Sequence, residues 1–231
     1  MLRRDFHQWG LAVLLGYAYG QAHALSLADI SRTEAGNGLQ AALESAATAA
    51  VGLLGQNGGF LDNPKVHIPL PGQLEKAAQM LRNFGQGKRI DELVTTMNRA
   101  AESAIPAGKD VLVGAVRSMT VDDAKKILTE GDTSVTHFFA EKTRIPLGEK
   151  FLPIVTQATQ KLGLVQQYNA LAGKAAGFGL LRSEDAKLEP YVTGKTLDGL
   201  FLVIGEQEQK IRQNPAAAGS AIVQKVFGAL R

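Results

Sequence analysis

The sequence offers few side chains for acid/base or metal chemistry, because only two of its four histidines lie beyond residue 24. One of them, His137, stands four residues before Glu141. If this stretch is helical, the two side chains share one face, as a metal-ligand pair or an acid/base pair requires. A zinc site normally needs three protein ligands, and no His-Glu-x-x-His pattern supplies them. We therefore weigh a hydrolase-type enzyme using His137 and Glu141 against a simple ion pair on a helix surface.

The other histidine lies in a proline-rich segment, residues 58–72, which reads GGFLDNPKVHIPLPG. Asp62 and Asn63 precede a proline, and this is turn chemistry, because both side chains bond nearby backbone groups. Three apolar residues then alternate with His67 and two prolines: Val66, Ile68 and Leu70. An apolar strip held by prolines predicts an ordered connector laid across helices, and a loop of this length is also a candidate binding surface. Asp62, Asn63 and His67 are its candidate binding residues.

A third polar group, Asn98, Arg99 and Glu102, lies beside the apolar stripe predicted for residues 89–104. Asn98 and Glu102 are one helical turn apart and share a face. Such a cluster either lines a pocket or forms a satisfied hydrogen-bond network that fixes the helix register. We favour the network, because buried polar groups usually find partners.

Other catalytic patterns are missing from the sequence. Gly219-Ser220 lacks the flanking residues of a G-x-S-x-G elbow. Gly194-Lys195-Thr196 resembles the end of a phosphate loop, but Glu189 occupies the required upstream glycine position. The chain contains no cysteine, which excludes disulfides, thiolate metal sites and cysteine nucleophiles. We expect no cofactor.

The charge of the chain is close to balance, with 25 lysines and arginines against 22 aspartates and glutamates. The basic residues are scattered along the sequence and form no stripe that could follow a phosphate backbone. This pattern argues against a nucleic-acid partner.

Residues 1–24 have the pattern of an export signal. A short basic start is followed by the apolar run WGLAVLLGYAYG and by the small-x-small site Ala22-His23-Ala24. Arg3-Arg4-Asp5-Phe6 also fits the core of a twin-arginine signal, so both that route and the general secretory route stay open. We expect cleavage near Ala24 and a periplasmic or secreted protein. The rest of the chain has no apolar run long enough to span a membrane.

The remaining chain, residues 25–231, reads as one all-α domain, a multi-helix bundle with one long ordered loop. Apolar residues recur at three- and four-residue steps, and strict strand-like alternation is scarce. The predicted helices cover residues 34–55, 74–85, 89–104, 107–118, 122–128, 132–143, 147–162, 164–172 and 190–213, with a short helix near the end. Gly85 and Gly87 predict the end of the second helix, Pro106 an end or kink of the third, and Pro146 and Pro153 interruptions. Thr120 to Asp123 predicts a capping box, and Asp132 an N-cap. Residues 173–187, rich in glycine, predict a hinge or exposed loop.

Four stretches taken together carry a family resemblance: GFLDNPKVHIPLP, MNRAAESAIP, MTVDDAKKIL and TGKTLDGLFLVIGEQEQKIRQNPAA, followed by KVFG. On these residues the chain resembles the bacterial exported family known as domain of unknown function 4197, over essentially all of residues 25–231. The resemblance implies an exported, mainly helical protein and brings no established activity.

Three functions therefore remain open. The first is binding of a small apolar or lipid-like, amphipathic molecule between helices, suggested by the 25 glycines and the loose segment 173–187. The second is a protein-interaction or envelope-maintenance module with an envelope protein as its partner, binding through residues 58–72 or the charged side of 190–213. The third is the enzyme based on His137 and Glu141. We favour binding over catalysis.

Overall fold

The computed structural model describes residues 32–131, 133–160, 166, 168–169, 172–173, 187–218 and 220–228. Helices dominate this part of the chain, and it contains no strand, which confirms the predicted all-α fold. In chain order the α-helices are α1 (Arg32–Leu54), α2 (Gly72–Leu81), α3 (Gly87–Ala104), α4 (Lys109–Arg117), α5 (Val121–Thr129), α6 (Ser134–Thr159), α8 (Leu188–Gln213) and α9 (Ala221–Gly228). Short helical turns of other types connect some of them: η2 (Arg82–Gln86), η3 (Ile105–Gly108) and η5 (Pro215–Ala218).

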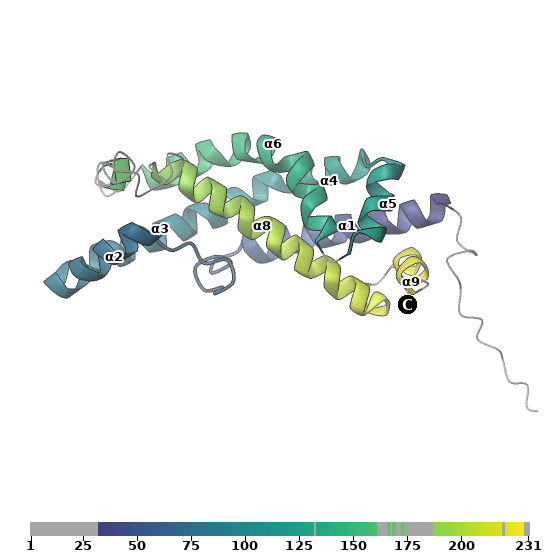
Figure 1. Cartoon of the computed structure of the whole chain (residues 1–231), viewed down its shortest axis with the longest axis horizontal. Coiled ribbons are helices and arrows are strands. Elements are labelled where there is room, and N and C mark those ends of the chain that lie inside the picture. The colour runs from purple at the N-terminus through teal and green to yellow at the C-terminus, as the bar shows by residue number, and fades with distance from the viewer. Residues whose placement is uncertain are drawn as a thin grey trace, which may run out of the picture.

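The helices form an elongated bundle (Figure 1). Helix α8 packs against α6 and α1, and α3 packs against α6. Helix α2 lies at one end of the molecule, and α9 lies near the other end beside α1 (Figure 1). None of the described helices combines the length and the apolar character needed to cross a membrane.

The core follows from the helical spacing of apolar residues. In α1 the residues at three- and four-residue steps are at most 1% exposed: Leu39, Leu43, Ala46, Ala50 and Leu54. Side chains at this spacing project from one face of a helix, and that face is turned toward α8 and α4. The alanines in the stripe allow the neighbouring helices to come close.

The predicted break around Pro146 is wrong, because α6 continues through both Pro146 and Pro153. Each proline removes one backbone hydrogen bond and disfavours the helix locally. The helix nevertheless buries a residue at every fourth position on both sides of the prolines: Phe139, Thr143, Leu147, Phe151, Val155 and Thr159. This continuous packing against α3 and α8 holds the helix together, and Figure 1 shows that α6 follows a bent course.

The other predicted boundaries are mostly confirmed. Pro106 lies in η3, which separates α3 from α4, and Thr120 forms a capping box with Asp123. The predicted stop at Gly85 and Gly87 is only partly right, because the π turn η2 leads directly from α2 into α3, although Gly85 has a positive φ of 81°. Asp132, most of the predicted helix 164–172 and nearly all of the loose segment 173–187 lie outside the described residues.

Candidate functional site

The long loop between α1 and α2 is an ordered segment, residues 55–71, which we call the strap. It first turns at Gly58, whose φ of 87° favours glycine, and then at Asn63, whose backbone oxygen accepts hydrogen bonds from Val66 and His67. The Asn63 side chain also accepts a hydrogen bond from the Lys65 amide at 3.1 Å. The predicted turn at this position is thus present.

The strap lies over the helices through its apolar residues. Four of them are at most 6% exposed: Phe60, Val66, Ile68 and Leu70. Of the intervening residues, His67 is half-buried and Pro69 is exposed, whereas Pro71 is buried. Buried apolar residues therefore alternate with more exposed residues up to Leu70, as the sequence pattern indicated, but Pro71 at the junction with α2 is also buried.

Glu102 of α3 anchors the first half of the strap. The backbone amides of Phe60 and Leu61 both donate to Glu102 Oε1 at 3.0 Å, and Arg99 Nη1 donates to Oε2 at 2.7 Å. Burial raises the pKa of the Glu102 carboxyl, but the hydrogen bonds from Leu61, Arg99 and Phe60, together with the Arg99 charge, outweigh burial and hold this pKa below its ordinary value. The carboxylate therefore stays charged while it organises the strap.

Asn98, one turn earlier on α3, anchors the second half. The Ile68 amide donates to Asn98 Oδ1 at 2.8 Å, and Asn98 Nδ2 donates to the carbonyls of Ile68 at 3.0 Å and Val94 at 2.9 Å. The Asn98 side chain is fully buried, and it satisfies both backbone groups of Ile68. The predicted polar cluster is thus a hydrogen-bond network, but it fixes the strap on α3, 30 and more residues away in sequence.

Contacts with α8 complete the attachment of the strap. Tyr191 donates its hydroxyl hydrogen to the Pro69 carbonyl at 2.8 Å, and Lys65 pairs with Glu206 at 2.7 Å. Within the strap, His67 Nδ1 lies 2.9 Å from the Leu61 carbonyl oxygen. A carbonyl can only accept, so this contact places the hydrogen of the ring on Nδ1.

Asp62 and His67 point to different partners. Asp62 is exposed, and its carboxylate lies against Gly58, where an added Cβ would come within 2.3 Å of Asp62 Oδ2. Within the described residues no hydrogen bond or ion pair connects Asp62 with His67.

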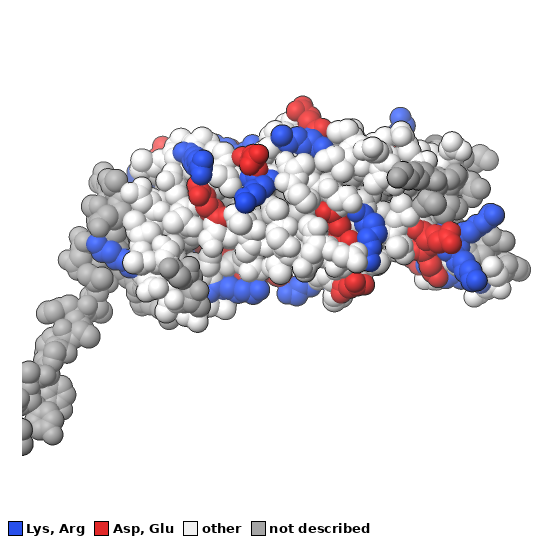
Figure 2. Space-filling model, turned by 180° about the vertical axis from the view of Figure 1, so that it is seen from behind, with Lys and Arg blue, Asp and Glu red and all other residues white. Residues whose placement is uncertain are grey.

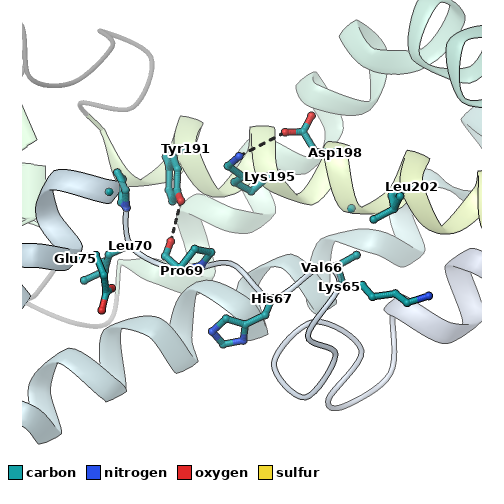
Figure 3. Close-up of a pocket in the computed structure, with 13 residues that line it drawn as sticks. Lys65, Val66, His67, Pro69, Leu70, Glu75, Tyr191, Lys195, Asp198 and Leu202 are labelled. Carbon is teal, nitrogen blue, oxygen red and sulfur yellow. Dashed lines mark hydrogen bonds and ion pairs between the residues drawn. The ribbon is translucent and has the colours of Figure 1, made fainter. Parts of the chain in front are cut away.

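An open groove of about 800 Å³ lies between the strap and α8 (Figure 3). One face of α8 forms a wall, and its groove residues follow helical spacing: Tyr191, Lys195, Asp198, Gly199 and Leu202. Val66 and Leu70 of the strap form the opposite apolar wall. At Gly199 an added Cβ would meet Phe60 Cε1 at 2.8 Å, so the strap touches the helix backbone there.

Of the candidate residues predicted in the strap, His67 lines this groove, whereas Asp62 and Asn63 do not. Residues 190–213 were considered as a binding surface only through their charged side, and the α8 residues of the groove were not singled out. Tyr191, Lys195, Gly199 and Leu202 flank the apolar stripe of α8, and their helical spacing was visible in the sequence. Nothing in the sequence indicated that residues 55–71 would lie along this particular face.

His137 and Glu141 are both exposed on α6, and neither lines the groove. In the described part of the chain they share no hydrogen bond or ion pair, and no group of three or more metal-ligating side chains of the His, Cys, Asp or Glu type comes together there. The face of the molecule seen in Figure 2 carries basic and acidic residues intermixed, with no extended patch of one sign.

The fold and site together define a helical bundle with a firmly anchored strap and an open groove beside it. The chain belongs to the family described as a protein of unknown function (DUF4197), whose model matches residues 29–228, which confirms the resemblance read from the sequence. No match was found among curated proteins or among solved structures.

Proposed function

We propose that this chain is an exported, non-catalytic binding protein that holds a small elongated amphipathic molecule in the groove between the strap and α8. The observation that carries the proposal is the groove, whose volume of about 800 Å³ falls within the range usual for small-molecule sites. Its walls combine apolar side chains with a few polar groups, the composition typical of such sites. The N-terminal residues with the pattern of an export signal support a role outside the cytoplasm.

The attachment of the strap supports binding because it fixes one wall of the groove in advance. Glu102 and Asn98 hold four backbone groups of the strap through buried or partly buried hydrogen bonds, and Tyr191 adds a fifth contact. A wall held in this way loses little conformational entropy when a ligand binds. The exposed pair His137 and Glu141 has no comparable support, so we favour binding over hydrolysis.

Leu202 offers a direct test, because its side chain lines the groove and is still 44% exposed. We expect Leu202→Glu to weaken binding of dansyl-undecanoate by about tenfold or more, since a carboxylate would have to be desolvated beside the apolar part of the ligand. Dansyl emission during titration of residues 25–231 measures the affinity.

Leu152→Glu is the matched control. Leu152 has nearly the same exposure, 40%, but lies on α6 outside the groove, so its replacement should leave the affinity unchanged. No binding of dansyl-undecanoate by the unmodified chain, or equal losses in the two variants, would contradict the proposed function.

A further inference from the structure

The ionic groups that line the groove differ in how well their charges are compensated. Lys65 lies 2.7 Å from Glu206, and Glu75 lies 2.9 Å from Arg82, so both form close ion pairs with groups beside the groove. Lys195 is different, because its Nζ lies 3.9 Å from Asp198 Oδ2, beyond hydrogen-bond distance.

Asp198 also forms an ion pair with a second cation, Arg144. Its Oδ1 accepts a hydrogen bond from Arg144 of α6, whose guanidinium lies over the Phe201 ring with 5.7 Å between Cζ and the ring centroid. One carboxylate thus faces two cations, and this cluster of Arg144, Lys195 and Asp198 carries a net charge of about +1 at neutral pH. Figure 3 shows Lys195 and Asp198 side by side on α8.

The apolar part of the groove begins next to this cluster. Leu202 lies seven residues after Lys195, or roughly 10 Å along the helix axis, and Val66 of the strap covers Gly199 between them. The groove therefore has a cationic position and an exposed apolar position on α8, with the apolar Val66 of the strap between them. This order fits a molecule with an anionic head and an apolar tail.

We infer that the ligand of the groove is an anionic amphiphile, with a carboxylate or phosphate head that binds Lys195 and a tail that lies along Val66 and Leu202. The inference deepens the proposed function and rests on it. Lys195 donates hydrogen bonds to the head, and the nearby Arg144 prevents Asp198 from neutralising Lys195 fully. Both cations are 41–46% exposed, so the head remains partly hydrated and salt screens its attraction.

The test compares three competitors of equal chain length in displacement of dansyl-undecanoate: dodecanoate, uncharged monododecanoylglycerol and dodecyltrimethylammonium, each kept below its micelle concentration. We expect dodecanoate to bind about tenfold more tightly than the glycerol ester, and this preference to shrink as salt is raised. Lys195→Gln should remove the preference without changing the affinity for the uncharged ester, and Lys195→Arg should keep it.

Lys150→Gln is the control for a general loss of positive charge, because Lys150 is exposed on α6 and does not line the groove. It should preserve the preference for dodecanoate. Urea unfolding of each variant shows whether the fold is intact, and Lys195→Gln should unfold at the same midpoint as the unmodified chain, because Asp198 keeps Arg144.

The outcomes separate the two proposals. If none of the three competitors binds, the proposed function fails and the inference fails with it. If dodecanoate and the glycerol ester bind equally, if the ammonium compound binds best, or if Lys195→Gln keeps the preference, only the inference fails. Sedimentation with phosphatidylglycerol vesicles without binding of monomeric dodecanoate would indicate a membrane surface as the partner and would also overturn the inference.

Discussion

Replacement of Glu102 by alanine is expected to lower the free energy of unfolding by about 3–4 kcal/mol, because two backbone amides and a charged partner lose their acceptor together. The amides of Phe60 and Leu61 lie at the start of the strap, and Phe60 is fully buried, so water cannot readily replace the lost carboxylate there. Urea unfolding followed by circular dichroism at 222 nm measures the change.

Two variants separate this effect from a general response to substitution. Glu102→Gln keeps an oxygen acceptor for the amides but loses the charge that pairs with Arg99, so we expect a smaller loss of about 1–2 kcal/mol. Glu141→Ala removes an exposed carboxylate on α6 and should change stability by less than about 0.5 kcal/mol. A loss in Glu102→Ala no larger than that in Glu141→Ala would show that the carboxylate does not hold the strap.

The contribution of the Glu102 carboxylate to stability depends on pH, and the lowered pKa sets the direction of this dependence. The folded chain lowers the pKa of Glu102, so its carboxylate contributes stability that is fully present above the ordinary glutamate pKa of about 4.3. This contribution is lost as the pH falls through the lower pKa of the folded state. The stability gap between the unmodified chain and Glu102→Gln should therefore narrow below about pH 4 and stay constant above about pH 5.

The fold was largely predictable because its signals are local. The apolar spacing of α1, α3 and α8, the capping box at Thr120 and the stop at Pro106 depend on residues a few positions apart. The continuity of α6 was not predictable, because two prolines oppose the helix locally and only its burial against α3 and α8 restores it. Tertiary packing decides the outcome at that position.

The candidate site was predictable only in part, because tertiary contacts between distant residues form it. The sequence marked Asn98, Arg99 and Glu102 as a cluster one helical turn in extent, but their partners are backbone groups of residues 60, 61 and 68. A backbone group has no signature in sequence, so its partner could not be identified. The groove residues of α8 were not singled out because Lys195 and Leu202 resemble other solvent-facing residues of a helix until the strap lies beside them.

The strap links stability to the groove, since the residues that fasten it also fix one wall of the candidate site. Phe60 illustrates this connection. Its ring is fully buried and lies against Gly199, which belongs to the opposite wall. Substitution of Phe60 or Gly199 should change the packing of the strap against α8. Because the two residues are in contact, the effects of the two substitutions should not add, and the difference is their coupling energy.

Phe60→Ala is expected to cost about 4 kcal/mol, since it removes a fully buried aromatic ring and leaves a cavity where the strap contacts α8. Gly199→Ala in the unmodified chain should cost about 1–3 kcal/mol, because its Cβ would lie 2.8 Å from Phe60 Cε1 and 3.2 Å from Val66 Cβ. Urea unfolding of both single variants gives these values.

The double variant tests the contact itself. Without the Phe60 ring the added methyl group loses its tightest contact, and alanine is a better helix former than glycine by about 1 kcal/mol. Gly199→Ala should therefore cost much less in the Phe60→Ala background, where the Val66 contact at 3.2 Å remains. Gly52→Ala is the control for helix propensity, because no atom lies within 4 Å of its added Cβ, and it should stabilise in both backgrounds alike. If the costs of Phe60→Ala and Gly199→Ala simply add, the Phe60 ring does not contact Gly199, and the strap does not pack against α8 at this point of the groove.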